Sequence, residues 1–367
     1  MKTYLYQVNV TRDCNLRCTH CYIHSDVKKA SKEMQGEQIL SVAHQIVEHM
    51  KSIRYDRAEI HIIGGEPTML GLDFFEKNIP LIREVLDGHG FSYELLLVSN
   101  LLHDRVVEIA RLFDRVTTSY EPETRFTKEK MEQRWIDWVK ALQDAGINVG
   151  VTTAITKPVV DFGARRLLDW FYEKRIKNIH LGFFIPSGDG FVNKAQVFPQ
   201  FHETSEFLIE AAKWQIEKRD IDPDLWVNPF ESMLAAVSTN TPLDDIVCPI
   251  ISGSMDVNWD GNAVTCLEKG GELGVQWQGN IFESSIKAVA ASKGFMEAVV
   301  KARRPKSVCV TCDEYQSCRS GCGVLFDYWD PNLDQDCPGF KKFIKFVRHS
   351  YESGVKPRYT EYAPKGC

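Results

Sequence analysis

The sequence predicts an α/β fold built on a parallel sheet, and two observations carry that prediction. Over the first two-thirds of the chain, short runs rich in β-branched and aromatic residues alternate with segments whose apolar residues recur at helical spacing. The strand-like runs are apolar nearly throughout, which is typical of strands covered on both faces. Six such strand–helix units predict a parallel sheet whose ligands gather at the carboxyl ends of its strands.

The expected elements follow one another along the chain with clear boundaries. The first strand is followed by a loop with three cysteines, the second ends in two glycines, and the third ends at Ser99-Asn100. Helices are expected through residues 39–50, through 72–86, up to residue 112, from 135 to a stop near Gly146, and through 167–172. The expected strands are residues 4–11, 58–63, 93–98, 115–119, 149–155 and 178–185.

Bulk properties exclude several classes of function. The formal net charge is −6 and the pI is about 6.0, so the basic surplus typical of nucleic-acid binding is missing. No apolar run approaches the roughly 20 residues that span a bilayer. Met1-Lys2 leads directly into the first expected strand, so we expect no signal peptide. We therefore expect neither a nucleic-acid nor a membrane partner.

Three cysteines follow the first expected strand as Cys14-x3-Cys18-x2-Cys21. Three thiolates can hold three irons of a [4Fe–4S] cube and leave the fourth iron open to the amine and carboxylate of a small molecule. A zinc knuckle or three unrelated thiols are the alternatives that the spacing alone leaves open. The grouping of the eleven cysteines favours metal centres over disulfides. Such centres need a reducing compartment, so we expect a cytoplasmic enzyme that works where oxygen is scarce.

The second expected strand ends in Gly64-Gly65-Glu66-Pro67. Two glycines let the backbone approach a ligand closely, and a carboxylate beside them can accept hydrogen bonds from an ammonium group. A simple strand-ending turn would also explain the glycines. The segment indicates a ligand-binding site only in combination with the cysteine triplet.

Together, these two motifs closely resemble those of the radical SAM superfamily. The resemblance implies a curved, six-stranded partial (β/α)6 barrel similar to a TIM barrel. It also implies that the three cysteines hold a [4Fe–4S] cluster, that Gly64-Gly65-Glu66-Pro67 binds the methionine amine of S-adenosylmethionine (SAM), and that His20 lies next to its adenine. One electron from the cluster would cleave SAM to methionine and a 5′-deoxyadenosyl radical, which abstracts hydrogen from an unactivated C–H bond.

Other SAM contacts are implied with less specificity. Ser99-Asn100 stands where the superfamily often has Thr-Asn-Gly, with Leu101 in place of the glycine. Ser119 matches a ribose-binding serine, but Tyr120-Glu121 replaces the aspartate that follows it in relatives. Turn residues and solvated helix charges are the plain alternatives. The implied contacts are Ser99, Asn100, Ser119, Arg125 for the SAM carboxylate with Arg134 as second choice, and Leu181 with Gly182 beside adenine.

The last third of the chain carries seven more cysteines in a pattern that resembles the SPASM extension of radical SAM enzymes. That resemblance implies two auxiliary [4Fe–4S] clusters, and hence three clusters in all. A zinc ribbon would suit Cys309-x2-Cys312 but does not explain all seven. The implied ligands are Cys248, Cys266 and Cys322 for auxiliary cluster I, and Cys309, Cys312, Cys318 and Cys337 for auxiliary cluster II.

One cysteine, Cys367, then remains. The fourth iron of auxiliary cluster I is either open, bound by an oxygen or nitrogen ligand, or bound by Cys367, whose alternative role is that of a thiol in a terminal tail. The cysteine-rich segment has few long apolar periods, so we expect cluster binding to hold it together. We therefore predict a radical SAM barrel over residues 1–230 and an auxiliary-cluster domain over residues 231–367.

The leading functional hypothesis is a peptide maturase of the kind that modifies ribosomal peptides. SPASM proteins mostly act on peptide or protein substrates, and such an enzyme would abstract hydrogen from a side-chain or α carbon. The product would be a thioether, a carbon–carbon link or an oxidised residue. An external one-electron donor such as flavodoxin or ferredoxin is implied. The chain begins at the first barrel strand, so we expect no leader-binding domain before it.

Two further enzymatic hypotheses stay open. An anaerobic sulfatase maturase would form formylglycine, but such enzymes place an aspartate base directly after the second cysteine of the extension. Here that position is Leu267, and Glu268 follows as the candidate base. A radical dehydrogenase or rearrangement enzyme acting on a small molecule is the other. A simple iron–sulfur electron carrier is disfavoured because it does not need the Gly-Gly-Glu-Pro segment.

Overall fold

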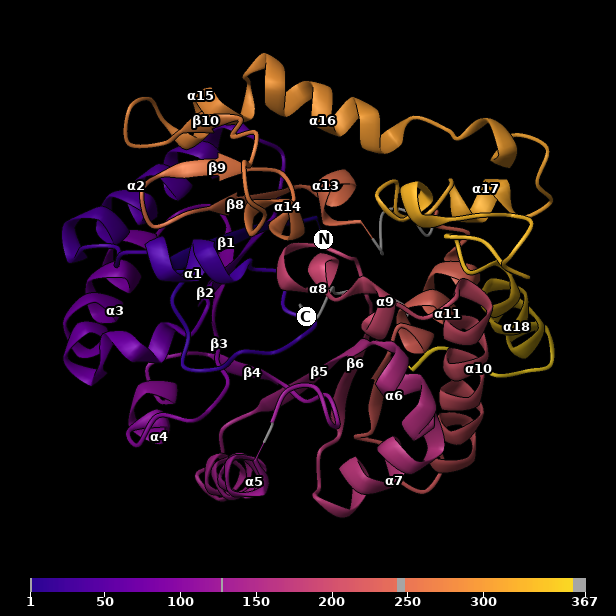
Figure 1. Ribbon diagram of the computed structural model, residues 1–367. Coiled ribbons are helices and arrows are strands. Elements are labelled where there is room, and N and C mark those ends of the chain that lie inside the picture. Colours follow the sequence, from indigo (N-terminus) through magenta and orange to yellow (C-terminus); the bar gives the residue numbers. More distant parts are fainter. Residues whose placement is uncertain (1, 127, 243–247, 359–367) are drawn as a thin grey trace.

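The computed structural model describes residues 2–126, 128–242 and 248–358. Its centre is one sheet with the strand order β10-β9-β8-β1-β2-β3-β4-β5-β6-β7. The strands from β8 through β1 to β7 pair in parallel, and the β8–β9 and β9–β10 pairs are antiparallel. Figure 1 shows the sheet curving around an interior with helices outside it. The predicted α/β fold with a partial, TIM-like barrel is thereby confirmed.

All six predicted strands are present, with small differences in length. The sixth ends at Phe183, two residues before the predicted end, and a short seventh strand beside it was not predicted. The strands are β1 (Thr3–Thr11), β2 (Arg57–Gly64), β3 (Ser92–Val98), β4 (Arg115–Ser119), β5 (Val149–Ile155), β6 (Asn178–Phe183), β7 (Trp226–Asn228), β8 (Ser254–Val257), β9 (Asn262–Val264) and β10 (Gly279–Asn280).

The helices that cover the barrel bury one apolar face each. In α2, for example, Ile39, Ala43, Ile46 and Met50 are buried at helical spacing. The helices are α1 (Ser25–Ala30), α2 (Gly36–Ser52), α3 (Leu72–Leu86), α4 (Val106–Ala110), α5 (Glu129–Asp144), α6 (Lys157–Phe162), α7 (Ala164–Glu173), α8 (Gly188–Val192), α9 (Lys194–Val197), α10 (Phe201–Lys218), α11 (Phe230–Thr239), α13 (Pro249–Ser252), α14 (Leu267–Gly270), α15 (Ile286–Ala290), α16 (Lys293–Arg303), α17 (Tyr315–Cys318) and α18 (Lys341–Glu352), with 3-10 turns η1 (Pro67–Leu70), η2 (Ser307–Cys309) and η3 (Leu325–Tyr328). None of the helices in the described part of the chain has the length and apolar character that crossing a membrane requires.

The inner face of the barrel is polar, which the near-continuous apolar strands of the sequence did not suggest. In β1, Val8 and Val10 belong to the apolar core, whereas Asn9 between them is buried but polar. His61 in β2 is likewise a buried polar residue between the apolar Ile60 and Ile62. Because side chains alternate along a strand, the apolar set packs beneath the helices and the polar set faces inward.

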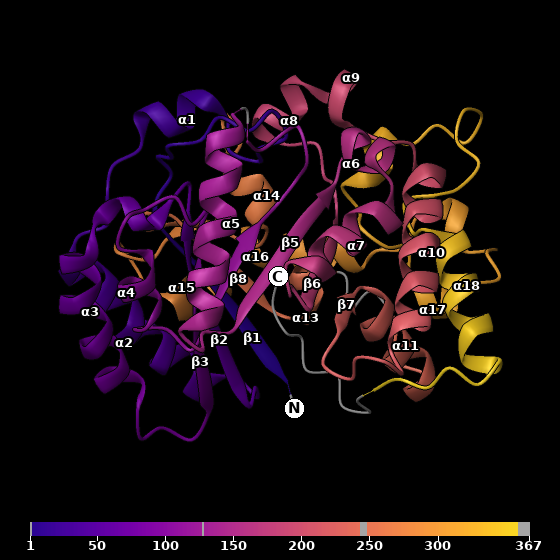
Figure 2. The ribbon, with the colours of Figure 1, turned by 90° about the horizontal axis from the view of Figure 1, so that it is seen from below.

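The last third of the chain joins the barrel sheet directly. Strand β8 pairs in parallel with β1, with Leu5 opposite Ser254 and Val8 opposite Val257. Across this seam, a guanidinium nitrogen of Arg12 lies 2.8 Å from Asp256, and both side chains are buried. The predicted boundary after residue 230 falls at the start of α11, which packs with α10 against α18 (Figure 2). The division into two domains stays a prediction, and the sheet continues across it.

Candidate active site

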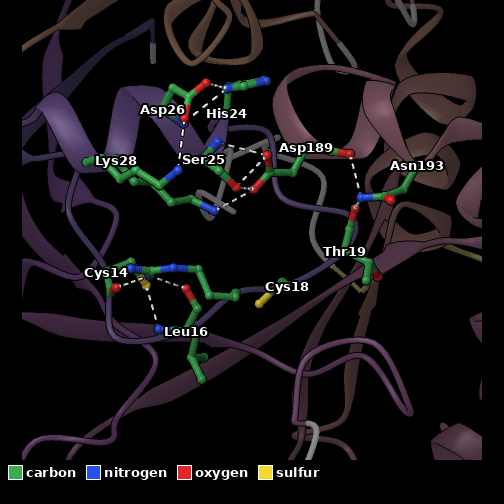
Figure 3. Close-up of polar contacts among 12 residues, drawn as sticks. Cys14, Leu16, Cys18, Thr19, His24, Ser25, Asp26, Lys28, Asp189 and Asn193 are labelled. Atoms are coloured by element: carbon green, nitrogen blue, oxygen red, sulfur yellow. Dashed lines mark hydrogen bonds and ion pairs between the residues drawn. The ribbon is translucent and has the colours of Figure 1, made fainter.

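The loop between β1 and α1 brings three thiols together at the carboxyl end of β1. Cys18 is buried, and Cys14 and Cys21 are partly buried. Burial raises the pKa of the Cys14 thiol to about 12, and the neighbouring charges of Cys18 and Cys21 add to this shift. The backbone amide of Leu16 donates to Cys14 Sγ over 3.3 Å (Figure 3). The triplet predicted from the spacing is therefore a spatial cluster.

Gly64 and Gly65 allow β2 to pass directly against this loop. A Cβ atom at Gly64 would lie 1.9 Å from the carbonyl oxygen of Thr11, and one at Gly65 would lie 2.1 Å from that of Asp13. The freed space is used by two hydrogen bonds, from Gly65 N to Thr11 O (2.9 Å) and from Glu66 N to Asp13 O (2.8 Å). What the glycines approach in this structure is the cysteine loop itself, which they fix relative to β2.

Glu66 ties the ends of β2 and β3 together. Its Oε1 accepts hydrogen bonds from Thr68 N, Thr68 Oγ1 and Ser99 Oγ at 3.0, 2.5 and 2.8 Å. Its Oε2 accepts from the backbone of Asn100 at 2.6 Å. Burial raises the pKa of this carboxyl group, and these donors oppose the shift. Since Oε2 has a single partner among the described residues, it keeps capacity for one more donor.

The loop after β3 reaches the cysteines through Asn100. Its amide Nδ2 lies 3.8 Å from Cys14 Sγ and 2.6 Å from Asn15 Oδ1. Leu101, which replaces the expected glycine, has φ +61° and is completely buried. Leu101 therefore adopts a left-handed backbone conformation that glycine tolerates better, at a cost in backbone strain.

A buried charged cluster lies on the other side of the cysteine loop. Glu121 Oε2 accepts from Arg125 Nε at 2.5 Å and lies 3.2 Å from His20 Nε2. Burial opposes ionisation of Glu121, but Arg125 and His20 outweigh it and lower the pKa to about 2. The backbone carbonyl of Arg125 lies 4.0 Å from Cys18 Sγ. Within the described residues, His20 Nδ1 is buried with no hydrogen-bond partner.

The sequence analysis named Glu121 only as a departure from the family pattern and missed its contacts, although its place two residues after Ser119 and the end of β4 could have pointed to the site. Ser119 itself is partly exposed at the strand end. Arg134 is exposed on α5 and pairs with Asp104, so the structure brings Arg125 and not Arg134 to the cysteine loop. Leu181 is buried in the apolar core. Because neighbouring residues of a strand face opposite sides, Leu181 can contact a ligand in the barrel only through its backbone.

A second buried ion pair, also missed in the sequence, joins α8 to α1, which follows the cysteine loop (Figure 3). Lys28 Nζ lies 3.0 Å from Asp189 Oδ2, and its side chain is 1% exposed. Asp189 also accepts from the backbone amide of Ser25 (2.8 Å), and Gly190 N donates to Cys21 O (2.9 Å). Burial lowers the pKa of Lys28, but its interactions with Cys21 and Asp189 outweigh that and raise it. The ammonium group thus places a positive charge beside the thiols.

Four of the C-terminal cysteines surround one small cavity, and they are the four that the SPASM resemblance assigns to auxiliary cluster II. The cavity is also lined by Phe326 and Lys341. Burial raises the pKa of Cys318 to about 12, with further contributions from the other three thiols. Gly339 leaves room for the sulfur, because a Cβ there would lie 2.5 Å from Cys318 Sγ. The four are Cys309, Cys312, Cys318 and Cys337.

Such a set of thiols around a shared cavity fits an iron–sulfur cluster, whose ligands bind at separate corners. Among the residues described, no group of three His, Cys, Asp or Glu side chains converges closely enough to hold a single metal ion. The cysteine loop fits in the same way, with three neighbouring thiols and an orphaned, buried ring nitrogen of His20 beside them.

The remaining C-terminal cysteines are Cys248, Cys266 and Cys322. The charge of Cys322 contributes to the raised pKa of Cys266, so these two thiols are neighbours. Cys248 stands at the start of α13. Glu268, two residues after Cys266, accepts a hydrogen bond from Ser187 Oγ over 2.9 Å, and burial raises its pKa to about 7. Cys367 lies outside the described residues.

The segment that carries Cys266 and Glu268 packs against the cysteine loop. The amide of His24 donates to Gly271 O over 2.9 Å. A Cβ at Gly271 would lie 2.4 Å from Tyr22 O, so the two backbones touch. The segment of Cys266 and the N-terminal cysteine loop thus border the same end of the barrel.

Comparisons with known proteins agree with this geometry. Residues 8–162 match the model of the Radical SAM superfamily. A cysteine-type anaerobic sulfatase-maturating enzyme of Clostridium novyi is 21% identical over 360 residues, which cover 91% of this chain and 92% of that protein. The same-named enzyme of Clostridium perfringens is 34% identical over 71 residues, 19% of each chain. The Fe-coproporphyrin III synthase of Methanosarcina barkeri is 26% identical over 223 residues, 57% of this chain and 52% of that one.

Solved structures show the same fold over nearly the whole chain. Native anSMEcpe with bound AdoMet and the Kp18Cys peptide has a TM-score of 0.74 at 18% identity, covering 96% of this chain and 98% of that one. SuiB of Streptococcus suis bound to the precursor peptide SuiA has a TM-score of 0.63 at 16% identity, covering 91% and 75%. With the matched family model, these findings identify the chain as a SAM-dependent enzyme with a radical SAM domain over residues 8–162, and its fold over nearly the whole chain is that of anSMEcpe and SuiB.

Proposed function

We propose that this enzyme modifies a peptide or protein substrate, abstracting hydrogen from a side-chain or α carbon to give a thioether, a carbon–carbon link or an oxidised residue. The observation that carries the proposal is the contact between the Cys266–Glu268 segment and the cysteine loop through Gly271, Tyr22 and His24. It puts a carboxylate and a second thiol group at the barrel end where SAM would bind. The relatives named as maturating enzymes and the peptide-bound structural neighbours favour a peptide substrate.

The proposed roles of the site residues follow from their contacts. Cys14, Cys18 and Cys21 would hold the SAM-binding cluster, and Glu66 would offer its free acceptor position to the amine of SAM. When bound, the cluster and SAM supply a carbon-centred radical that can take a hydrogen atom from an unactivated C–H bond. Glu121, itself paired with Arg125, contacts Nε2 of His20, and the other ring nitrogen of His20 would face the adenine of SAM.

Glu268 is the proposed base. A thioether or an oxidised product forms only if the substrate loses a proton and an electron in addition to the hydrogen atom, and an auxiliary cluster would accept that electron. Glu268 is fixed by Ser187 of the β6–α8 connection and lies beside Cys266, so it is placed to take that proton. The proposal rests on this placement.

Formation of formylglycine is the second candidate. It is favoured by the similarity to cysteine-type sulfatase-maturating enzymes over 91% of the chain. Leu267 at the position of their aspartate base speaks against it, unless Glu268 takes over that task. Dehydrogenation or rearrangement of a small molecule is a third candidate, which a lack of turnover with both classes of peptide would favour.

The proposed cofactor content is three [4Fe–4S] clusters, or about twelve irons by thiolate counting. Auxiliary cluster I has three assigned thiolates, and we propose that its fourth iron is open or bound by a group other than cysteine. Replacing Cys367 by Ala should then leave the iron content unchanged. Loss of about four irons in that variant would make Cys367 a ligand. We also propose a cytoplasmic location and an external one-electron donor.

The experiment compares substrates under anaerobic conditions. The reconstituted enzyme, SAM and dithionite are incubated with a cysteine-containing sulfatase peptide and with short peptides encoded near its gene, and products are read by mass spectrometry. A cross-link or loss of hydrogen in a neighbouring peptide supports maturation, and conversion of the thiol to an aldehyde supports the second candidate. The Glu268→Gln variant should still form 5′-deoxyadenosine but yield little product. Turnover of neither peptide class, with a small molecule consumed instead, overturns the proposal.

A further inference from the structure

An exposed surface that combines apolar and basic side chains extends from α16 to the start of the cysteine-rich segment. In Figure 1, α16 lies along the outer edge of the molecule, and the chain continues from it toward α17. Val300 is 63% exposed and Val310 is 62% exposed. We call residues 296–310 the α16 surface. Its exposed apolar members are Met296, Val300, Val308 and Val310.

The α16 surface is basic in a chain whose formal net charge is −6. Residues 301–306 contain four cations in the sequence Lys-Ala-Arg-Arg-Pro-Lys. In the described part of the chain, none of these four forms an ion pair, and Glu297 at its edge pairs with Lys293. By contrast, Lys341 and Lys345 nearby are both paired with Asp313. The positive charge of the surface is therefore not neutralised from within.

The α16 surface also borders the cavity of the four cysteines. The amide of Cys309 donates to the carbonyl of Lys306 over 2.9 Å. The ammonium group of Lys306 lies 5.4 Å from the ring centre of Phe326, which lines that cavity. Cys309 and Cys312 are themselves partly exposed. A protein that docks here comes close to these two thiols.

We propose that the α16 surface docks an acidic one-electron carrier protein such as reduced flavodoxin. The proposal rests on the proposed function, since only a chain that holds iron–sulfur clusters needs such a donor. In each encounter the carrier is oxidised by one electron and an iron–sulfur centre of the enzyme is reduced by one, with no atoms exchanged. Unpaired cations around exposed apolar residues suit such a partner, because charge steers the encounter while a small apolar contact keeps it short-lived.

Binding and catalysis are tested separately. The binding test titrates the reconstituted enzyme with a bacterial flavodoxin by calorimetry at low and moderate salt. The Lys301→Glu/Arg304→Glu variant reverses two exposed charges of the α16 surface. The Lys77→Glu/Lys140→Glu variant makes the same change in net charge on exposed positions of α3 and α5. The first should raise the Kd about 10-fold, and the second less than about 2-fold. Added salt should weaken binding of the wild type most, because exposed charges are screened.

The catalytic readout keeps this proposal apart from the proposed function. With dithionite as reductant, both variants should form 5′-deoxyadenosine like the wild type, because dithionite needs no docking surface. With flavodoxin, the α16 variant alone should show a raised KM for the carrier. Equal flavodoxin affinity of wild type and α16 variant overturns the docking proposal. Binding of single-stranded RNA to this surface as tightly as flavodoxin would also overturn it. Failure of every variant and the wild type with dithionite would instead refute the proposed function.

Discussion

The two cysteine regions present the same type of ligand but are held in different ways. The N-terminal loop is fixed by hydrogen bonds from several strands and helices, among them Glu66 N to Asp13, Gly190 N to Cys21 and Asn100 Nδ2 to Asn15. The C-terminal cysteines lie among short turns, and Leu325 is the single fully buried apolar residue described between 305 and 339. The first site is organised by hydrogen bonds within the protein, whereas we expect the second to depend far more on what it binds.

Free energies make this contrast quantitative. Ordering the backbone costs about 1–2 kcal/mol per residue, and one fully buried Leu returns only about 1.5–3 kcal/mol. Residues 305–339 therefore gain too little from apolar burial to offset their ordering. The binding of metal to thiolates contributes free energy of folding directly and can supply the difference.

The largest expected effect separates the two regions. Replacing Cys14, Cys18 and Cys21 by Ala should abolish 5′-deoxyadenosine formation but leave the fold and about eight irons in place. Replacing Cys312 and Cys318 by Ala should remove about four irons and open residues 305–340 to proteases. Iron analysis, limited proteolysis and hydrogen exchange measure these outcomes. A protected 305–340 segment in the second variant would contradict the contrast drawn here.

The next effect concerns the seam that joins the two regions. Asp256→Ala leaves Arg12 buried without its charge partner, and breaking such a pair costs about 3–5 kcal/mol of unfolding free energy. The double variant Arg12→Met/Asp256→Leu removes both charges and should recover most of that loss. Urea unfolding of the holoenzyme measures both. If the double variant is as unstable as the single one, the pair does more than neutralise charge.

A smaller effect is expected at Glu66, which is held by hydrogen bonds within the protein and is also proposed to bind SAM. Glu66→Ala should weaken SAM binding by about 1.5–3 kcal/mol, because it removes a charge-assisted acceptor. The same change leaves Ser99 Oγ and the amide of Asn100 without an acceptor, so unfolding free energy should fall as well. Thr68→Val is the matched control, since it removes a donor to Glu66 without touching the carboxylate. Unchanged SAM affinity in Glu66→Ala would restrict Glu66 to a structural role.

The sequence predicted elements that depend on local patterns and missed contacts between distant residues. The alternation of strand-like and helix-like segments along the chain located six strands. The spacing of the cysteines located both cysteine groups. Lys28 and Asp189 were missed because 161 positions separate them, and neither is unusual in its own segment. Glu121 was missed because its partner His20 lies on another loop. The pairing of β8 with β1 is likewise a long-range event that no short pattern encodes.

Leu101 replaces the glycine of the family pattern in a left-handed backbone conformation, and it gives the last test, which is decided by a difference of about 1 kcal/mol. With φ +61°, a non-glycine residue bears about 1–2 kcal/mol of strain, yet its buried side chain contributes more. Leu101→Ala keeps the strain and loses the packing, so it should cost about 2–5 kcal/mol. Leu101→Gly loses the same packing but relieves the strain, and should be more stable than the Ala variant by about 1 kcal/mol. A Gly variant more stable than the Ala variant is the reverse of the order usual in helices and strands. Urea unfolding of the two variants decides it, and an Ala variant as stable as the Gly variant would show that the loop relaxes out of the left-handed turn.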